Sequence, residues 1–443
     1  MSSNNGPDPA PDAGRAAGWW ARHGLDLAPL RMSAFRLLYL ARLVGVLTYG
    51  VLAVSVAWQV WSLTQSSLHV AGVGVGLAIG TLAGLLWGGV LADRADRRRV
   101  MVMSRAAYVL VIVILLANSL RETPGVSWIY AATVLSGLTG GISAPSLMST
   151  LPRLVPLALL PAAGALNALL EQGGRLVGPL IAGAVIAAWG LAYSFSVVLV
   201  GAILIPVLLS RLPSLPAAPD AAGASAGKAS ASRRRPASIQ GWIDGARFAL
   251  KSPVVGGLLI LDVLMALLAT PWVLLPQWSE QVLGGDARLL GMLHAAPAVG
   301  AVLAAALAGW TRRLRRPGGV VVLAALCWGV LMAGLGSVSS VFLALAVLAL
   351  AGAVDTISDI IRGALLQQHT PDHLRGRVSA LWLLEVNLAP AAGGMLIGGV
   401  AQRLGPALAL LAGGACCALG SLALAGCQKG LRASQWSDRA LTP

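Results

Sequence analysis

The sequence predicts an all-α polytopic membrane protein with twelve transmembrane helices, arranged as two pseudo-symmetric six-helix bundles. Of its 443 residues, 57% are apolar and only 11% are charged, a combination that water-soluble chains do not show. Apolar stretches long enough to cross a bilayer recur twelve times, and a polar segment separates the first six from the last six. At about 20 residues per span, these stretches use most of the chain. No large soluble catalytic domain fits, so we do not expect an enzyme.

Each predicted helix corresponds to one apolar stretch. They lie near residues 37–61, 70–90, 101–118, 128–150, 163–189 and 192–210, and then near 254–279, 289–310, 319–336, 341–364, 377–401 and 406–426. The segment between the two sets is rich in Ala, Ser and Pro, as linkers are. We therefore expect an N-terminal tail (1–34), an N-terminal bundle (35–211), a linker (212–252), a C-terminal bundle (253–428) and a C-terminal tail (429–443).

Basic residues fall on alternate sides of the predicted spans. The segments that would share the side of the N-terminus hold 26 Lys and Arg, whereas the opposite loops hold three. Because positive loops stay in the cytoplasm, both tails and the linker are expected there. The first 30 residues have no apolar core of a signal peptide, which agrees with this orientation. The excess of 32 basic over 17 acidic residues thus indicates topology and not binding of nucleic acid.

The two halves look like a parallel duplication. Leu-Leu-Glu is followed by a Pro within a run of small residues both at 169–183 and at 383–394. Glycines recur every four residues from Gly72 to Gly88, and small residues repeat this ridge at 296–308. Two six-helix repeats around a central pathway are typical of a rocking transporter. The matching ridges favour helices that slide during gating, and the alternative is ordinary tight packing.

The most specific motif follows the second span, where residues 89–99 read Gly-Val-Leu-Ala-Asp-Arg-Ala-Asp-Arg-Arg-Arg. It resembles the cytoplasmic loop signature of the major facilitator superfamily, with Asp96 in place of the usual Gly. A carboxylate there can meet a helix N-terminus across the bundle, and arginines can pair with it and hold the inner gate shut. The resemblance implies a gating loop made of Gly89, Asp93, Arg94, Arg97 and Arg98.

A second motif lies in the fifth span. Gly174, Gly178, Pro179 and Gly183 resemble the antiporter signature of exporters in this superfamily, although Ala182 occupies a glycine position. This resemblance favours export over uptake, whereas a plain Pro kink in a Gly-rich helix is the alternative. Residues 136–142 of the fourth span lack the arginine that many such antiporters carry.

Across about residues 33–430 the chain resembles the enterobactin-exporter family, most clearly at residues 35–43, 88–94, 252–257 and 374–378. This resemblance implies export of a siderophore, a catecholate or a hydroxamate, from the cytoplasm across the bacterial inner membrane in exchange for protons. In such a role in iron homeostasis, the partners would be a small-molecule substrate and the lipid bilayer. The energy source would be a proton gradient, and no cofactor or metal would be needed. The protein would function as a monomer. A multidrug or macrolide efflux transporter is the alternative within transport. A non-transporting membrane sensor would need an output domain, and the residues after Gln428 are too few for one.

Charged groups inside the spans mark the expected pathway, because charge in hydrocarbon is costly. They are Arg42, Glu171, Arg175, Asp262, Asp355, Asp359, Arg362 and Glu385. Glu171 and Arg175 share one helix face and could form an ion pair. Asp355, Asp359 and Arg362 likewise share one face of their helix. Five acids against three arginines leave at least two acids without a basic partner, and Asp355 or Asp359 is the expected proton carrier. In the superfamily that the chain resembles, spans 1, 4, 7 and 10 line the central cavity. This would place Arg42, Asp262 and Asp355 or Asp359 on its wall, and Glu171 and Arg175 of the fifth span behind it.

The remaining motifs predict little chemistry. Residues 223–228 lack the spacing and the Ser or Thr of a phosphate-binding loop. Four cysteines without CxxC spacing suggest neither disulfides nor a zinc site. The five histidines show no metal-binding spacing and are expected at surfaces or membrane edges.

Overall fold

The computed structural model describes residues 26–214 and 239–436, apart from the side chains of residues 92–94, 239–242, 244 and 312. Outside these ranges lie residues 1–25 of the predicted N-terminal tail, 215–238 of the predicted linker and 437–443 of the predicted C-terminal tail. Within them, all regular secondary structure is helical, which confirms the predicted fold class.

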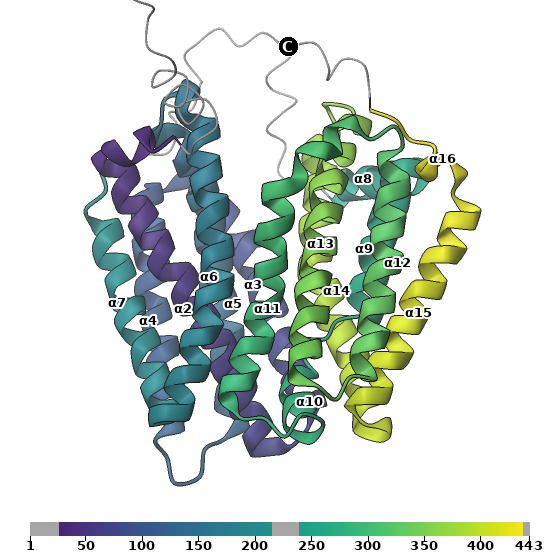
Figure 1. Cartoon of the computed structure of the whole chain (residues 1–443). Coiled ribbons are helices and arrows are strands. Elements are labelled where there is room, and N and C mark those ends of the chain that lie inside the picture. The colour runs from purple at the N-terminus through teal and green to yellow at the C-terminus, as the bar shows by residue number, and fades with distance from the viewer. Residues whose placement is uncertain (1–25, 215–238, 437–443) are drawn as a thin grey trace, which may run out of the picture.

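Six long helices form the N-terminal half (Figure 1). They are α2 (Ser33–Thr64), α3 (Ser67–Arg94), α4 (Arg97–Ser119), α5 (Val126–Leu154), α6 (Leu160–Trp189) and α7 (Leu191–Ser210), preceded by a short 3-10 turn at Ala28–Arg31. Helices α5 and α6 meet at an angle of 113°. They are two separate spans, because α5 packs on α3 and α4 while α6 packs on α2 and α11.

The C-terminal half repeats this arrangement with one broken span. Its helices are α8 (Ile239–Lys251), α9 (Pro253–Leu268), α10 (Leu275–Gln281), α11 (Ala287–Leu307), α12 (Pro317–Gly336), α13 (Val341–His369), α14 (Arg375–Leu404), α15 (Pro406–Cys427) and α16 (Lys429–Arg432). The amphipathic α8 occupies the second part of the predicted linker and meets α9 at 100°. Nine described helices are long and apolar enough to span a bilayer alone. The N-terminal half reaches six spans with α5 and α6, and the C-terminal half reaches six with the broken span that contains α9.

The seventh span was expected to be continuous over 254–279, and this is wrong. Helix α9 ends at Leu268 and the chain resumes a helix at Leu275. Pro271 disfavours helical backbone at the residue before it and lacks an N–H group. The carbonyl oxygen of Ala269, freed by the break, accepts a hydrogen bond from Trp328 Nε1 at 3.1 Å. Broken spans are tolerated where protein groups satisfy the freed backbone in this way.

The small-residue ridges pack helices within each half. A Cβ on Gly80 of α3 would lie 2.0 Å from the Val134 oxygen of α5, and one on Gly300 of α11 would lie 1.7 Å from the Ala349 oxygen of α13. Backbones therefore touch at these positions, as small residues permit. The ridges thus bring α3 against α5 and α11 against α13; sliding along them during gating stays a prediction.

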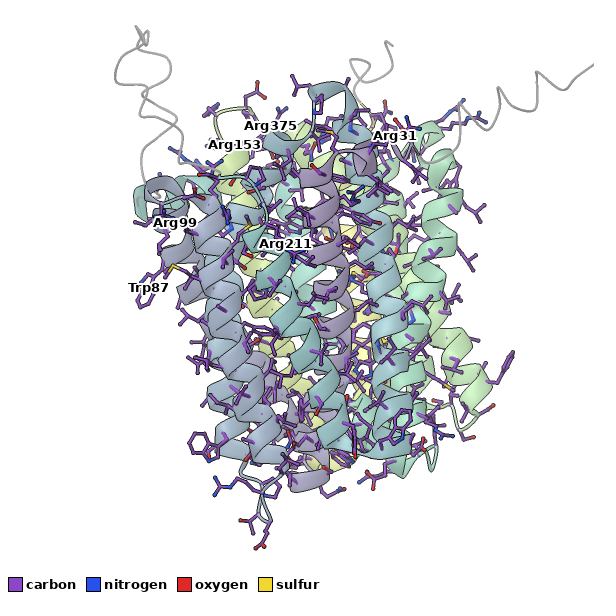
Figure 2. All side chains as sticks on the ribbon, turned by 90° about the vertical axis from the view of Figure 1, so that its left-hand side faces the viewer. Arg31, Trp87, Arg99, Arg153, Arg211 and Arg375 are labelled. Atoms are coloured by element: carbon purple, nitrogen blue, oxygen red, sulfur yellow. The ribbon has the colours of Figure 1, made fainter. Side chains whose placement is uncertain are left out.

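Several arginines lie toward one end of the molecule, here called the basic end. Figure 2 shows Arg31, Arg99, Arg153 and Arg375 there. At the opposite, far end the two halves touch directly: a Cβ on Gly183 of α6 would lie 3.1 Å from the Gly291 Cα of α11. Toward the basic end the halves lean apart (Figure 1). The structure is thus closed at the far end.

Candidate transport pathway

A central cavity of about 1390 Å³ lies between the two halves. Residues of α2, α3 and α6 line one side, and residues of α11 and α13 line the other. Most of these are apolar, while the charged ones are Glu171, Arg175, Asp355 and Asp359. Drug-sized ligands occupy pockets of about 300–1,000 Å³, so the cavity has room for a large organic molecule.

Hydrogen bonds between the two halves close the far end of this cavity. Ser67 at the start of α3 donates to Gln277 of α10 at 2.6 Å, and Trp61 near the end of α2 donates to Glu280 of α10. Both α10 residues follow the break in the seventh span. The break therefore places polar side chains where the halves must separate if the far end is to open.

On the N-terminal side, Arg42 and not Arg175 is the partner of Glu171. Arg42 Nη2 of α2 lies 2.7 Å from Glu171 Oε1 of α6. The two helices touch, because a Cβ on Gly50 would lie 2.9 Å from the Gly178 Cα. This approach brings the long arginine side chain within reach of the neighbouring helix. The expected intrahelical pair of Glu171 with Arg175 is therefore wrong.

Arg175 instead lines the central cavity, within coulombic range of Asp355 and Asp359 on the opposite wall. No carboxylate of the described chain forms an ion pair with it. The expectation that α6 would stand behind the cavity is also wrong, since Glu171 and Arg175 lie on its wall. The Gly50–Gly178 contact draws α6 in beside α2 and so accounts for this.

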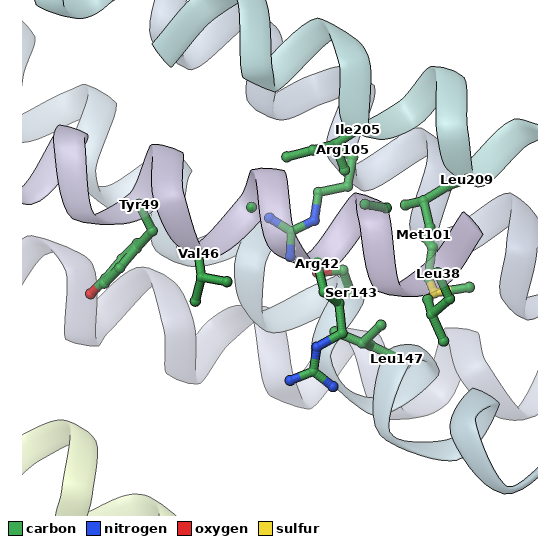
Figure 3. Close-up of a pocket in the computed structure, with 12 residues that line it drawn as sticks. Leu38, Arg42, Val46, Tyr49, Met101, Arg105, Ser143, Leu147, Ile205 and Leu209 are labelled. Atoms are coloured by element: carbon green, nitrogen blue, oxygen red, sulfur yellow. The ribbon is translucent and has the colours of Figure 1, made fainter. Parts of the chain in front are cut away.

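A smaller pocket of about 220 Å³ adjoins the cavity on the N-terminal side. Arg42 and Arg105 line it, and Val46 and Tyr49 line both spaces (Figure 3). Arg42 was expected on the wall of the central cavity and lies here instead. Arg105 is missing from the predicted charged groups inside the spans, although α4 begins at Arg97 and carries it into the bundle. Its position within the apolar run 100–116 was the signal that could have found it.

On the C-terminal side, one buried arginine holds two aspartates. Arg362 of α13 pairs with Asp359 of the same helix and with Asp262 of α9. Its side chain is 6% exposed, against 14% for Asp262 and 53% for Asp359. Asp262 thus pairs with Arg362 and does not line the cavity, where it was expected.

Two further carboxyl groups adjoin this cluster. Asp355, one helical turn before Asp359, lines the cavity as predicted for span 10. Glu385 of α14 is the neighbour of Asp262 on the other side, and its Oε2 is buried without a hydrogen-bond partner. We call Asp262, Asp355, Asp359, Arg362 and Glu385 the acidic cluster. It holds four carboxyl groups around one guanidinium.

The loop after the second span is organised by Asp96, the residue that departs from the superfamily pattern. Its side chain caps α4 by accepting hydrogen bonds from the backbone N–H groups of Arg98 at 2.8 Å and Arg99 at 3.4 Å. Asp is a favoured N-cap residue. Asp96, at the position where the superfamily pattern has Gly, therefore gives α4 a capped start. Arg98 donates to the Ser210 oxygen at the end of α7, within the same half.

The remaining predicted gating residues are Gly89, Asp93, Arg94 and Arg97. A Cβ on Gly89 would meet nothing within 4 Å. The side chains of Asp93 and Arg94 lie outside the described residues, and Arg97 begins α4 beside the capping Asp96. The gating role of this loop stays a prediction.

The glycines of the antiporter-like motif are contact points on α6. Gly174 and Gly178 pack on α2, where their Cβ atoms would lie 2.6 Å from the Val46 Cβ and 2.8 Å from the Gly50 Cα. Gly183 packs on α11 of the other half, 2.7 Å from the Ala287 oxygen by the same measure. Pro179 lies between these contacts and lines the cavity.

One histidine departs from the expected surface positions. His294 of α11 lines the central cavity, and its ring centroid lies 6.1 Å from that of Trp272. Its Nδ1 is 3.0 Å from the Leu290 oxygen. Helical periodicity alone did not reveal which face of α11 would meet the cavity. In the described part of the chain no group of His, Cys, Asp and Glu is arranged to hold a metal.

Comparison with known proteins gives a match over nearly the whole chain. Residues 25–440 match the family model described as transmembrane secretion effector, of the major facilitator superfamily. The enterobactin exporter EntS of Shigella boydii serotype 18 is 30% identical over 382 residues, which cover 86% of this chain and 88% of that protein. EntS of Escherichia coli O139:H28 matches with the same identity and coverage.

Solved structures of other transporters share the fold. A D-xylose-proton symporter superposes with a TM-score of 0.70 at 15% identity, covering 91% of this chain and all of that one. A POT family transporter in complex with a thioalcohol-conjugated peptide gives 0.70 at 12% identity, covering 89% and 96%. At these identities the likeness concerns architecture and leaves substrate open.

Proposed function

Since this chain belongs to the transmembrane secretion effector family of the major facilitator superfamily, a family of membrane transporters and not of enzymes, we propose that it exports a siderophore in exchange for protons. Export would run from the cytoplasm to the periplasm across the bacterial inner membrane. The observation that carries the proposal is the 30% identity to enterobactin exporters over 86% of the chain. The cavity of about 1390 Å³ supports it, because a siderophore is a large, oxygen-rich molecule.

The orientation follows from the charge of the two ends. Loops rich in Lys and Arg remain in the cytoplasm, so the basic end is the cytoplasmic end. A cavity whose far end is closed would then load its cargo from the cytoplasm, which is the first step of export. A reporter fused after Ala229 should be active in the cytoplasm, and activity confined to the periplasm would reverse this orientation.

Proton exchange would involve the acidic cluster. Four carboxyl groups around one guanidinium cannot all carry charge cheaply inside a membrane. Asp355 and Asp359 line the cavity, whereas Asp262 and Glu385 do not. Protonation of Asp355 or Asp359 from the periplasm would therefore change the charge of the wall that meets the cargo. Arg175 on the facing wall would compete with the proton for the same carboxylates.

A multidrug efflux transporter is the second candidate. The mostly apolar lining of the central cavity favours it, since broad drug binding depends on apolar and aromatic surface more than on placed polar groups. Trp272 and Trp328 contribute such surface on the C-terminal side.

Deletion of the gene under iron starvation separates the two candidates. We expect less siderophore in the medium and more in the cells, with unchanged uptake of supplied ferric siderophore. Plasmid-borne wild-type protein should restore secretion, whereas Asp355→Asn should not. Unchanged secretion together with new drug sensitivity would favour the multidrug transporter.

A further inference from the structure

Arg105 lies inside the bundle without a carboxylate partner. It is the ninth residue of α4, about 12 Å along the helix at 1.5 Å per residue. Among the described residues no Asp or Glu oxygen lies within the 4.0 Å that defines an ion pair with it. The ionisable groups that act on it are the Tyr108 hydroxyl of the same helix and Arg42, which carries charge of the same sign. A guanidinium in this setting is stabilised by water or by an anion that arrives.

The pocket beside Arg105 contains more positive than negative charge. Arg42 and Arg105 both line it, and Glu171, on the wall of the adjoining cavity, neutralises one of them. The remaining charge belongs to the pocket and not to a structural ion pair. In Figure 3 the Arg105 guanidinium overlaps α2 and the Arg42 guanidinium extends below that helix, with Tyr49 further along it.

The size and walls of the pocket favour an aromatic group. Its volume is about 220 Å³, and Leu38, Met101, Ile205 and Leu209 give it apolar walls. An apolar cavity of about 150 Å³ is enough to hold benzene. Since Val46 and Tyr49 line both spaces, a group attached to cargo in the central cavity can enter without a separate route.

We propose that this pocket is an anion-binding subsite for one acidic, ring-sized group of the cargo, such as an aryl carboxylate or an ionised phenol. Arg105 would hold the negative charge, Arg42 would contribute the second guanidinium, and the apolar walls would hold the ring. Arginine suits this role because its planar fork of N–H groups matches a carboxylate. The inference rests on the proposed function only in taking the central cavity as the place where cargo is bound.

The test compares two probes that differ in charge alone. Purified full-length protein in nanodiscs of zwitterionic lipid is titrated with radiolabelled benzoate and with its neutral isostere benzamide. We expect wild-type protein to prefer benzoate. Arg105→Gln should weaken benzoate binding roughly tenfold, the size of one hydrogen bond to a charged group, and leave benzamide unchanged. Arg105→Lys should retain part of the preference, and Arg403→Gln, an exposed arginine at the far end, should retain all of it.

A second variant tests the pocket without removing charge. Gly45 lines the pocket, and a Cβ there would meet only Ile205 Cδ1 at 3.8 Å, so Gly45→Leu fills the space without displacing backbone. It should abolish binding of both probes. Gly334→Leu, at an exposed position of α12 with nothing within 4 Å, is the matched control. Size-exclusion profiles confirm that each variant is folded.

Two results would overturn the inference: equal affinity of wild-type protein for benzoate and benzamide, or unchanged benzoate binding by folded Arg105→Gln. Failure of the proposed function looks different. In that case the wild-type protein would bind benzoate in the pocket, yet its deletion would leave siderophore secretion intact.

Discussion

The two halves share an architecture but carry opposite charge along the pathway. On the N-terminal side Arg42, Arg105 and Arg175 outnumber a single acid, Glu171. On the C-terminal side the acidic cluster sets four carboxyl groups against Arg362. The duplicated scaffold therefore does not imply duplicated chemistry.

This difference assigns separate tasks to the two walls. A basic wall suits an anionic cargo, and an acidic wall with one arginine suits protons, because each carboxyl group can gain or lose a charge. Once Arg105 is counted, the spans hold five acidic residues and four arginines, one arginine more than the sequence analysis assigned to them. The imbalance of charge is nevertheless larger within each half than over the whole chain, since the surplus bases belong to the N-terminal half and the surplus acids to the C-terminal half.

Removal of Arg362 should have the largest effect on this comparison. Arg362→Gln leaves Asp262 and Asp359 without their buried partner, a change that typically costs about 3–5 kcal/mol. We expect a large loss of folded protein, measured by size exclusion and thermal unfolding in detergent. Arg375→Gln is the matched control, because its ion pair with Asp372 is exposed and worth about 0–1 kcal/mol. Equal unfolding temperatures for the two variants would mean that the acidic cluster does not depend on Arg362.

The next largest effect should come from Asp355. Asp355→Asn keeps the shape of the side chain but removes its titration, so proton-driven export should fall by at least about tenfold while cargo exchange without a gradient continues. Proteoliposomes with an imposed pH gradient measure both. Asp359→Asn and Asp262→Asn are tested beside it. If all three variants keep gradient-dependent transport, coupling lies outside the acidic cluster.

The contrast between the walls could be predicted from the sequence only where it depends on local spacing. Asp355, Asp359 and Arg362 share a helix face because they are three and four residues apart, and this was foreseen. The Arg42–Glu171 pair joins residues 129 positions apart and depends on the contact between Gly50 and Gly178. The all-helical fold and the gathering of arginines at the basic end follow from composition and periodicity. The break after Leu268 and the pocket at Arg105 do not, since each depends on packing between distant segments.

A smaller effect is expected where the halves are alike. Gly80→Ala and Gly300→Ala each place a Cβ against a backbone oxygen, at 2.0 and 1.7 Å. Overpacking of this kind costs about 1–3 kcal/mol, so each variant should lower the unfolding temperature. Gly140→Ala, where a Cβ would meet nothing within 4 Å, should leave it unchanged. If the glycine ridges were sliding surfaces instead of fixed contacts, these variants would lower the transport rate with little effect on unfolding.

The smallest expected effect concerns the loop that would join the two halves at the basic end. Asp93 is predicted to meet the start of α14 near residues 376–379 when that end closes, because N–H groups at a helix N-terminus carry partial positive charge. Such a contact contributes about 0.3–1 kcal/mol when exposed and up to ~2 when partly buried. Asp93→Asn should therefore shift the protein toward the state described here, in which the halves lean apart at the basic end. In a background without native cysteines, a cysteine at Ala165 of the cavity wall should then react faster with a thiol reagent applied from the cytoplasmic side. Gly309→Ala, in the segment after α11 where a Cβ would meet nothing within 4 Å, is the matched control outside the predicted gating loop. Wild-type transport and unchanged labelling by Asp93→Asn would mean that the loop does not hold the halves together.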